Sequence, residues 1–141
     1  MKKIIIALSI VFANVCVFAQ TKPAAKPAQP FVLNAKDSML CKAWKVKVIE
    51  RFNTKSEPSG TEKNDGLTFV LDQTSFVTID GKTSTGKWVT DKAKTLITVT
   101  NDETKEIMKF RIKSLQSEEL IVHYQDKELM TTVYTFVPSK K

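Results

Sequence analysis

Hydrophobic and polar residues alternate along most of the chain from Trp44 onward. Trp44, Val46 and Val48, for example, are separated by Lys45 and Lys47. Alternation with a period of two, in runs rich in Val, Ile, Thr and aromatic residues, is typical of half-buried β-strands. Runs of this kind predict about eight strands, around residues 44–48, 67–71, 76–79, 88–89, 96–99, 108–112, 120–124 and 132–136.

Short polar turns separate the predicted strands. Asp80-Gly81 is a two-residue hairpin signal, and the other reversals are rich in Asp, Asn, Ser and Lys. No helical pattern of about 10–15 residues lies between strands, which excludes the crossovers that a parallel sheet needs. The pattern predicts an all-β, antiparallel, up-and-down meander. Its edges would disappear if it closed into a barrel, and a β-sandwich is the alternative.

The first 30 residues have a different composition. Lys2 and Lys3 precede an apolar run of about 15 residues that leads to Ala19, the pattern of a secretory signal peptide. Such a run is short for a membrane-spanning helix. Residues 20–30 are rich in Ala, Lys and Pro and predict an extended linker. We therefore expect a signal peptide at 1–19, a linker at 20–30 and a folded domain at 31–141. The protein is expected to be exported, whether periplasmic, surface-bound or secreted.

Two cysteines need separate interpretations. Cys16 lies in the apolar run, and Val15 is bulkier than the residue that usually precedes a lipid-modified cysteine. We expect Cys16 to be removed with the signal peptide, and a lipid anchor is the alternative. Cys41 would then be the single thiol of the mature chain. We expect it to act as a small buried hydrophobe, with a reactive or intermolecular thiol as the alternative.

Two segments interrupt the strand pattern. Residues 34–40 predict a short helical turn with Asn34 as its N-cap. The loop that begins at Asn53 and ends at Asp65 is long, polar and contains Pro58. Loops of this length are usually functional or mobile. We expect this loop at one mouth of the barrel, as a candidate lid or partner contact, and a tolerated surface insertion is the alternative.

Three parts of the sequence resemble the small secreted lipocalin-like domains, of the calycin type, that are common in Bacteroidetes. They are residues 40–46 (LCKAWKV), residues 85–89 and 94–100 (TGKWV and KTLITVT), and residues 114–122 with 132–136 (SLQSEELIV and TVYTF). The resemblance spans residues 39–138. It implies a closed or nearly closed barrel capped by an N-terminal helical turn, and it implies no particular ligand.

The sequence departs from that family at two places. Lys42 stands where the family has a glycine in the first strand. The last strand has no Arg to stack on Trp44, a contact that larger lipocalins make. The presence of Lys42 in place of glycine is expected to affect how the helical turn packs under the barrel.

The residues offer little catalytic chemistry. A single His and two Cys exclude a three-His site and a four-thiolate zinc site. No Gly-x-Ser-x-Gly elbow or phosphate-binding glycine loop is present. His123, the one imidazole, fits an ordinary strand residue better than a catalytic base. We therefore expect no enzyme, no cofactor and no metal, with catalysis through His123 as a remote alternative.

The charge is moderately basic. The formal net charge is +7, and losing Lys2 and Lys3 with the signal peptide would make it +5. Basic rows at 45 and 47, and at 109, 111 and 113, are diluted by acidic residues such as Glu50 and Glu106. Together with the export signal, this favours a solvated outer face over a nucleic-acid site.

Large side chains in the strands are expected to point inward and either fill the barrel or leave a cavity. They are Trp44, Phe69, Phe76, Trp88, Met108, Phe110, Tyr134 and Phe136. The leading hypothesis is non-enzymatic binding of a small hydrophobic or amphipathic molecule inside the barrel. Its expected lining residues are Trp44, Phe69, Trp88, Phe110 and Tyr134. The alternative is an envelope-associated protein-interaction module with a packed barrel, which contacts its partner through the loop between Asn53 and Asp65.

Overall fold

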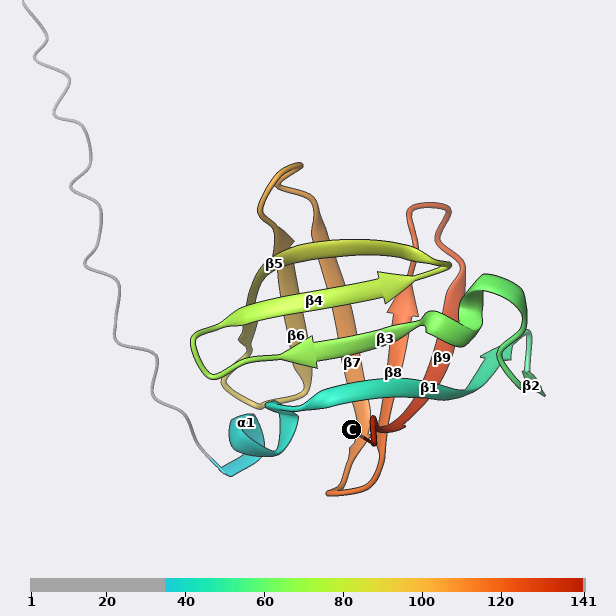
Figure 1. The fold of residues 1–141 in the computed structure, drawn as a ribbon, viewed down its shortest axis with the longest axis horizontal. Helices are drawn as coiled ribbons and strands as arrows, with labels where there is room; N and C mark the ends of the chain where they lie inside the picture. Colours follow the sequence, from blue (N-terminus) through green and yellow to red (C-terminus); the bar gives the residue numbers. More distant parts are fainter. Residues whose placement is uncertain (1–34, 141) are drawn as a thin grey trace, which may run out of the picture. The chain divides into compact units, whose positions relative to one another are not determined.

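The first and last strands of the domain pair with each other and close the sheet. In the computed structural model, which describes residues 35–140, β1 (Ala43–Arg51) pairs with β9 (Thr131–Pro138) (Figure 1). Each strand is antiparallel to its neighbours, and their spatial order follows the chain. The other strands of the barrel are β3 (Gly66–Phe69), β4 (Thr74–Ile79), β5 (Lys82–Thr90), β6 (Leu96–Asn101), β7 (Ile107–Leu115) and β8 (Leu120–Gln125).

The closed barrel has eight strands, because the ninth, β2 (Thr54–Ser56), pairs only with β1. In Figure 1, β1, β3, β4 and β5 cross over β6–β9 at a steep angle. The predicted antiparallel, up-and-down, lipocalin-like barrel is therefore confirmed, and the sandwich is not formed. The predicted signal peptide, the linker, Cys16 and Asn34 lie outside the described residues.

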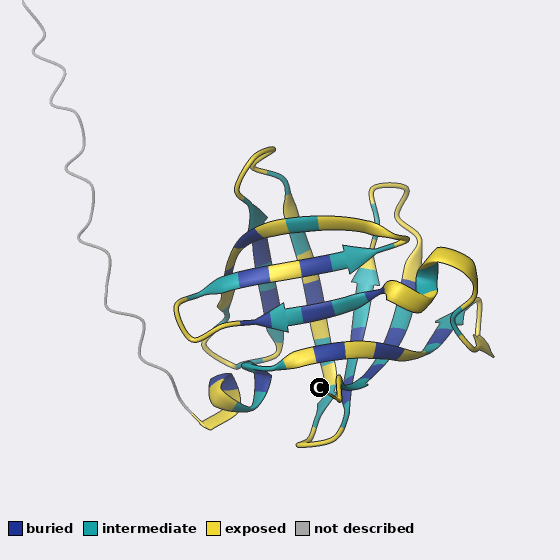
Figure 2. Ribbon diagram, in the orientation of Figure 1, coloured by how far each residue is buried: buried dark blue, intermediate teal, exposed yellow. Residues whose placement is uncertain are grey.

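The alternating pattern of the sequence corresponds to alternating burial along the strands (Figure 2). The alternation is interrupted in β1, and a second register shift lies in β7 between Ile112 and Ser114. The register between β1 and β9 shifts between Val46 and Val48, so Ile49 is fully buried and Val48 is only partly buried. A β-bulge of this kind adds one residue to one strand and reverses the faces beyond it. The alternation in the sequence predicts Val48 on the same face as Trp44. This prediction is wrong because the β-bulge reverses the faces of the strand beyond Val46.

Phe76 also differs from its prediction. It was expected to face inward, but it is 44% exposed, whereas its neighbours Ser75 and Val77 are buried. The cause is the pairing of β4 with β3 and β5, which turns Ser75 and Val77 inward and Phe76 outward. A run of four strand-forming residues does not by itself say which alternate pair faces the core.

The helix α1 (Ala35–Leu40) covers one end of the barrel, as the predicted helical turn implies. Leu40 is buried, and its carbonyl accepts a hydrogen bond of 3.0 Å from the Trp44 indole Nε1. Lys42, at the position where the resembled family has glycine, keeps its side chain outside the core. Its ammonium donates to the Ser117 carbonyl at 2.9 Å and lies 5.0 Å from the centre of the Trp44 ring.

A buried ion pair fastens α1 to the barrel. The Asp37 side chain is completely buried, and one of its carboxylate oxygens lies 2.8 Å from the Lys94 ammonium in the β5–β6 turn. The other accepts a hydrogen bond of 2.9 Å from the Thr90 hydroxyl. Lys94 also donates to Thr90 Oγ1 at 2.8 Å. These contacts connect the helix to a turn more than fifty residues later in the chain.

The segment between Asn53 and Asp65 is regular over much of its length. It contains β2 and the 3-10 helix η1 (Gly60–Asn64). The buried Asp65 carboxylate accepts hydrogen bonds from the backbone N–H groups of Asp80 and Gly81, at 3.0 and 3.1 Å. These two residues have φ of 51° and 74° and form the predicted two-residue hairpin. The segment is therefore bonded directly to the β4–β5 turn.

Candidate functional site

A cavity of about 500 Å³ opens at the end of the barrel opposite α1. Three strand connections meet around it: the β4–β5, β6–β7 and β8–β9 turns. Its apolar and aromatic lining comes from Val77, Ile79, Met108, Tyr124, Met130 and Tyr134. Its polar and charged lining comes from Arg51, Asp80, Lys82, Thr83, Ser84, Asn101, Glu106, Asp126, Lys127, Glu128 and Thr132.

Aromatic rings form the floor of this cavity. The Tyr124 ring stacks on Phe110 at a centroid distance of 5.1 Å and lies 6.4 Å from the Tyr134 ring. Tyr134 in turn stacks on Phe136 at 5.6 Å. Because Phe110 and Phe136 are fully buried, the floor rests on the packed core and does not continue into a channel through the barrel.

The structure separates the five residues that the sequence selects as ligand-binding. All five are buried, but of these only Tyr134 lines the cavity, and Phe110 lies directly behind Tyr124. Phe69 and Trp88 pack against each other at 5.2 Å in the core. Trp44 borders a second, more open groove together with Lys45 and Phe76. The binding role of all five stays a prediction.

Sequence reasoning missed most of the residues that line the cavity. Val77, Ile79 and Tyr124 are inward-facing residues near the ends of strands that lead into the β4–β5 and β8–β9 turns. In an up-and-down barrel, alternate turns lie at the same end. Selecting the inward-facing residues next to every second turn would therefore have identified these residues. Selecting the largest side chains instead favoured the aromatic residues of the core.

Carboxylates hold the one arginine of the cavity. Arg51 Nη1 lies 2.6 Å from Glu62 Oε1 of η1, and Nη2 lies 3.6 Å from Asp80 Oδ1. The hydrogen bond with Glu62 is the main cause that raises the pKa of Arg51 and lowers the pKa of Glu62. Arg51 thus joins η1 to the ring of charged side chains around the cavity opening, which we call the rim. Its positive charge is already balanced by carboxylates of the protein.

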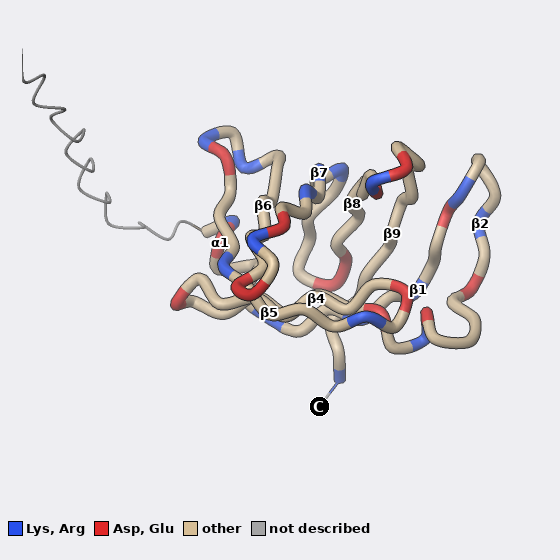
Figure 3. Tube along the Cα trace, turned by 90° about the horizontal axis from the view of Figure 1, so that it is seen from above, with Lys and Arg blue, Asp and Glu red and all other residues tan. Residues whose placement is uncertain are grey.

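Another ion pair and a tight turn complete the rim. Glu106 Oε1 lies 2.5 Å from Lys127 Nζ and bridges the β6–β7 and β8–β9 connections. In the β8–β9 turn, Asp126 Oδ1 accepts hydrogen bonds of 2.9 Å from the backbone N–H groups of Glu128 and Met130. Figure 3 shows how acidic and basic residues gather in such connections. The mouth is therefore framed by charged side chains above an aromatic floor.

The two tyrosines of the cavity should ionise only at high pH. Burial is the main cause that raises the pKa of Tyr134 to about 12, and the Asp80 carboxylate adds to it. Burial, then Asp126, raises the pKa of Tyr124. They are the only tyrosines of the chain, so a titration of tyrosinate absorbance reports on this site alone. We expect both groups to titrate above 10.0, the ordinary pKa of tyrosine.

The same shift makes stability depend on pH. A tyrosine with a raised pKa in the folded state stabilises fully below its unfolded pKa, and this stability is lost as pH rises toward about 12. The variant Tyr124→Phe isolates Tyr134 in the titration. A midpoint near 10.0 for that variant would contradict the buried position of Tyr134.

His123 and Cys41, the imidazole and the thiol that the sequence analysis weighed for reactive roles, lie away from the cavity lining. His123 lies on β8 between Arg111 and Val133 of the neighbouring strands and does not line the cavity. Cys41 is partly buried, and burial, then Asp37, raises the pKa of its thiol. Because its pKa is raised, less of this thiol is in the reactive thiolate form at neutral pH. This favours the packing role expected for Cys41.

Residues 35–140 contain no group of three or more His, Cys, Asp or Glu side chains that could hold a metal ion. Within the same part of the chain, no helix is long and apolar enough to cross a membrane.

No model of a known protein family matches the sequence, and a search of curated proteins finds no match. The functional proposal accordingly depends on the cavity and its lining residues.

Proposed function

We propose that this protein is a non-enzymatic, exported carrier that binds a small hydrophobic or amphipathic molecule in the cavity at the open end of the barrel. One observation carries the proposal: a cavity of about 500 Å³ combines an aromatic and aliphatic floor with a charged rim. Ligand sites are typically concave, mostly apolar and roughly 300–1,000 Å³ in volume, with a few polar groups that orient the ligand. Eight-stranded barrels can hold one small ligand at such a mouth.

In this proposal, the segment between Asn53 and Asp65 forms one side of the cavity mouth. Glu62 is bonded to Arg51, and Asp65 is bonded to the β4–β5 turn. These contacts favour a rigid side wall of the mouth over a moving lid. The ligand would enter between the turns and lay its apolar part on Tyr124 and Met108, which are partly accessible in the cavity lining.

A cavity-filling substitution tests the carrier proposal. Met108 on β7 lines the cavity and is partly buried, so Met108→Trp should occupy the space that a ligand needs. We expect the variant to bind the neutral fluorescent probe N-phenyl-1-naphthylamine at least about tenfold more weakly than the unmodified protein, a loss of roughly 1.4 kcal/mol. Fluorescence titration gives the dissociation constants.

The matched control is Lys109→Trp, because Lys109 is the next residue of the same strand and is exposed. It adds the same indole outside the barrel and should leave probe affinity unchanged. Equal weakening by both variants would contradict binding in this cavity. Native mass spectrometry of the protein from its natural envelope, before and after denaturation, would identify a molecule that purifies with it.

A protein-interaction module is the second candidate function. It is favoured by large apolar side chains that remain exposed beside the mouth: Phe52 is 82% exposed at the β1–β2 turn, and Leu129 is 75% exposed in the β8–β9 turn. Phe52 directly precedes the segment that was expected to contact a partner. Absence of probe binding by the unmodified protein would favour this candidate.

A further inference from the structure

The sign of the charge at the cavity mouth differs from that of the chain. Four carboxylates line the cavity, those of Asp80, Glu106, Asp126 and Glu128. Three cations line it, those of Arg51, Lys82 and Lys127. The lining is therefore formally negative by one charge, whereas the whole chain is positive by seven.

Two of the three cations are already engaged. Arg51 is held by Glu62 at 2.6 Å and by Asp80 at 3.6 Å, and Lys127 is held by Glu106 at 2.5 Å. Glu62 is not itself a lining residue, so it adds a further negative charge directly behind the rim. At Arg51 and Lys127, a carboxylate or phosphate of a ligand would have to compete with these carboxylates for its cation. Lys82, exposed at the start of β5, is the third cation of the lining, so two of the three cations are poorly suited to an anionic head group.

Asp80 is well placed to contact a positively charged head group. It is the first residue of the β4–β5 hairpin turn, and its carboxylate is 62% exposed and has one distant ion-pair partner, Arg51 at 3.6 Å. Its negative charge acts on both floor tyrosines, because it contributes to the raised pKa of Tyr124 and of Tyr134. The Asp80 carboxylate and both tyrosines line the same cavity, so one ligand cation bound there can meet a carboxylate and an aromatic face together.

We propose that the cavity binds a cationic amphipathic molecule, whose apolar body lies on the aromatic floor and whose amine or quaternary ammonium group lies beside Asp80. This proposal rests on the carrier function proposed above and adds the chemical class of the ligand. The ammonium would gain Coulomb attraction at the rim and a cation–π contact with a tyrosine. The apolar body would gain from burial on the floor side chains.

Three probes with the same alkyl chain isolate the effect of the head group. They are decyltrimethylammonium, decanol and decyl sulfate, titrated by calorimetry into the full mature chain below their micelle-forming concentrations. We expect the ammonium to bind on the order of tenfold more tightly than decanol, and decyl sulfate to bind most weakly. Added salt should reduce the difference between the ammonium and decanol, because the rim is exposed to solvent.

Asp80→Asn is the decisive variant. Asn-Gly suits a two-residue turn in which both residues have positive φ, so the hairpin should remain intact. We expect Asp80→Asn to reduce the preference for the ammonium over decanol from about tenfold to about one. Because Asp80 raises the pKa of Tyr134, that pKa should fall in the variant, which confirms that the charge was removed from the site.

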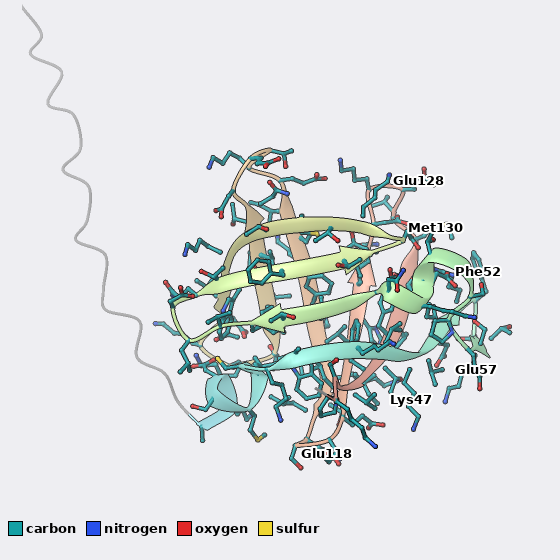
Figure 4. The ribbon with its side chains drawn as sticks, viewed as in Figure 1. Lys47, Phe52, Glu57, Glu118, Glu128 and Met130 are labelled. Carbon is teal, nitrogen blue, oxygen red and sulfur yellow. The ribbon has the colours of Figure 1, made fainter. Side chains whose placement is uncertain are left out.

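Glu118→Gln is the matched control, since it also removes one negative charge. Glu118 lies in the β7–β8 connection, and Figure 4 shows it at the opposite end of the barrel from Glu128. It should leave the preference for the ammonium unchanged.

The possible failures are distinguishable. If none of the three probes binds, the carrier function fails and the ligand class fails with it. If decanol binds but decyl sulfate binds as well as the ammonium, or Asp80→Asn has no effect, the cationic class is overturned and cavity binding stands.

Discussion

Replacing Trp88 with alanine is expected to lower the free energy of unfolding by about 3–5 kcal/mol, as is typical for a large aromatic residue of a packed core. The Trp88 side chain is fully buried and its ring lies 5.2 Å from that of Phe69. Its indole Nε1 donates a hydrogen bond of 2.9 Å to the Val70 carbonyl. The variant would therefore leave a cavity between strands and deprive the Val70 carbonyl of one of its two donors, the other being the Gln73 N–H at 3.1 Å.

Denaturant unfolding measures this loss, and two further variants make it specific. Trp88→Phe keeps part of the ring volume and should cost clearly less than Trp88→Ala. Val89→Ala changes the next residue of β5, which is exposed, and should cost within about 0.5 kcal/mol. A loss below about 1 kcal/mol for Trp88→Ala would contradict the packed position of this residue.

The Trp88→Ala variant should affect ligand binding much less than stability. Because Trp88 does not line the cavity, Trp88→Ala should retain probe affinity at temperatures where it is folded. The sequence had selected Trp88 as a ligand-binding residue, and a folded Trp88→Ala variant that no longer binds the probe would support that selection.

Replacing Lys94 with methionine is expected to destabilise the protein by about 3 kcal/mol, because it removes the cation from a buried carboxylate. Asp37 is completely buried, and the Lys94 ammonium lies 2.8 Å from its carboxylate. Methionine has a similar length and reduces the loss of packing. The Thr90 hydroxyl would remain as a donor to Asp37, but it brings no positive charge.

The double variant Asp37→Asn with Lys94→Met tests the cause. Removing both charges should recover part of the stability that Lys94→Met loses, since the buried negative charge is then absent. Lys92→Met, in the same turn but exposed, is the control and should be close to neutral. If the double variant is as unstable as the sum of the single variants, the two side chains do not act as a pair.

Local sequence was sufficient for the strands and for one hairpin. Alternation between Trp44 and Val46 and the lysines beside them predicts β1, because successive side chains of a strand point to opposite faces. Asp80-Gly81 predicts a turn because these residues tolerate positive φ. The antiparallel meander follows, since short polar turns connect neighbouring strands. Closure into a barrel was preferred to a sandwich because it removes the edges, and the structure confirms it.

The position of the cavity could not be predicted in the same way. Alternation tells whether a side chain faces inward, but not how far along the barrel it lies. That height depends on the stagger between strands, including the register shift in β1 and the closure of β1 on β9. Tyr134 therefore lines the mouth, whereas Trp88 packs in the core, although both are large inward-facing aromatic residues.

The sequence by itself determined the antiparallel strands, their short turns and a helical turn before the first strand, because local periodicity and turn chemistry depend on neighbouring residues. It left a barrel and a sandwich as alternatives, and the pairing of β1 with β9 decided between them. Only the tertiary structure decided which charges meet. Asp37 and Lys94 are separated by 57 residues, and Arg51 ends β1 whereas Asp80 lies in the β4–β5 turn. Their pairing, and with it the charge at the cavity mouth, results from how the strands close around the core.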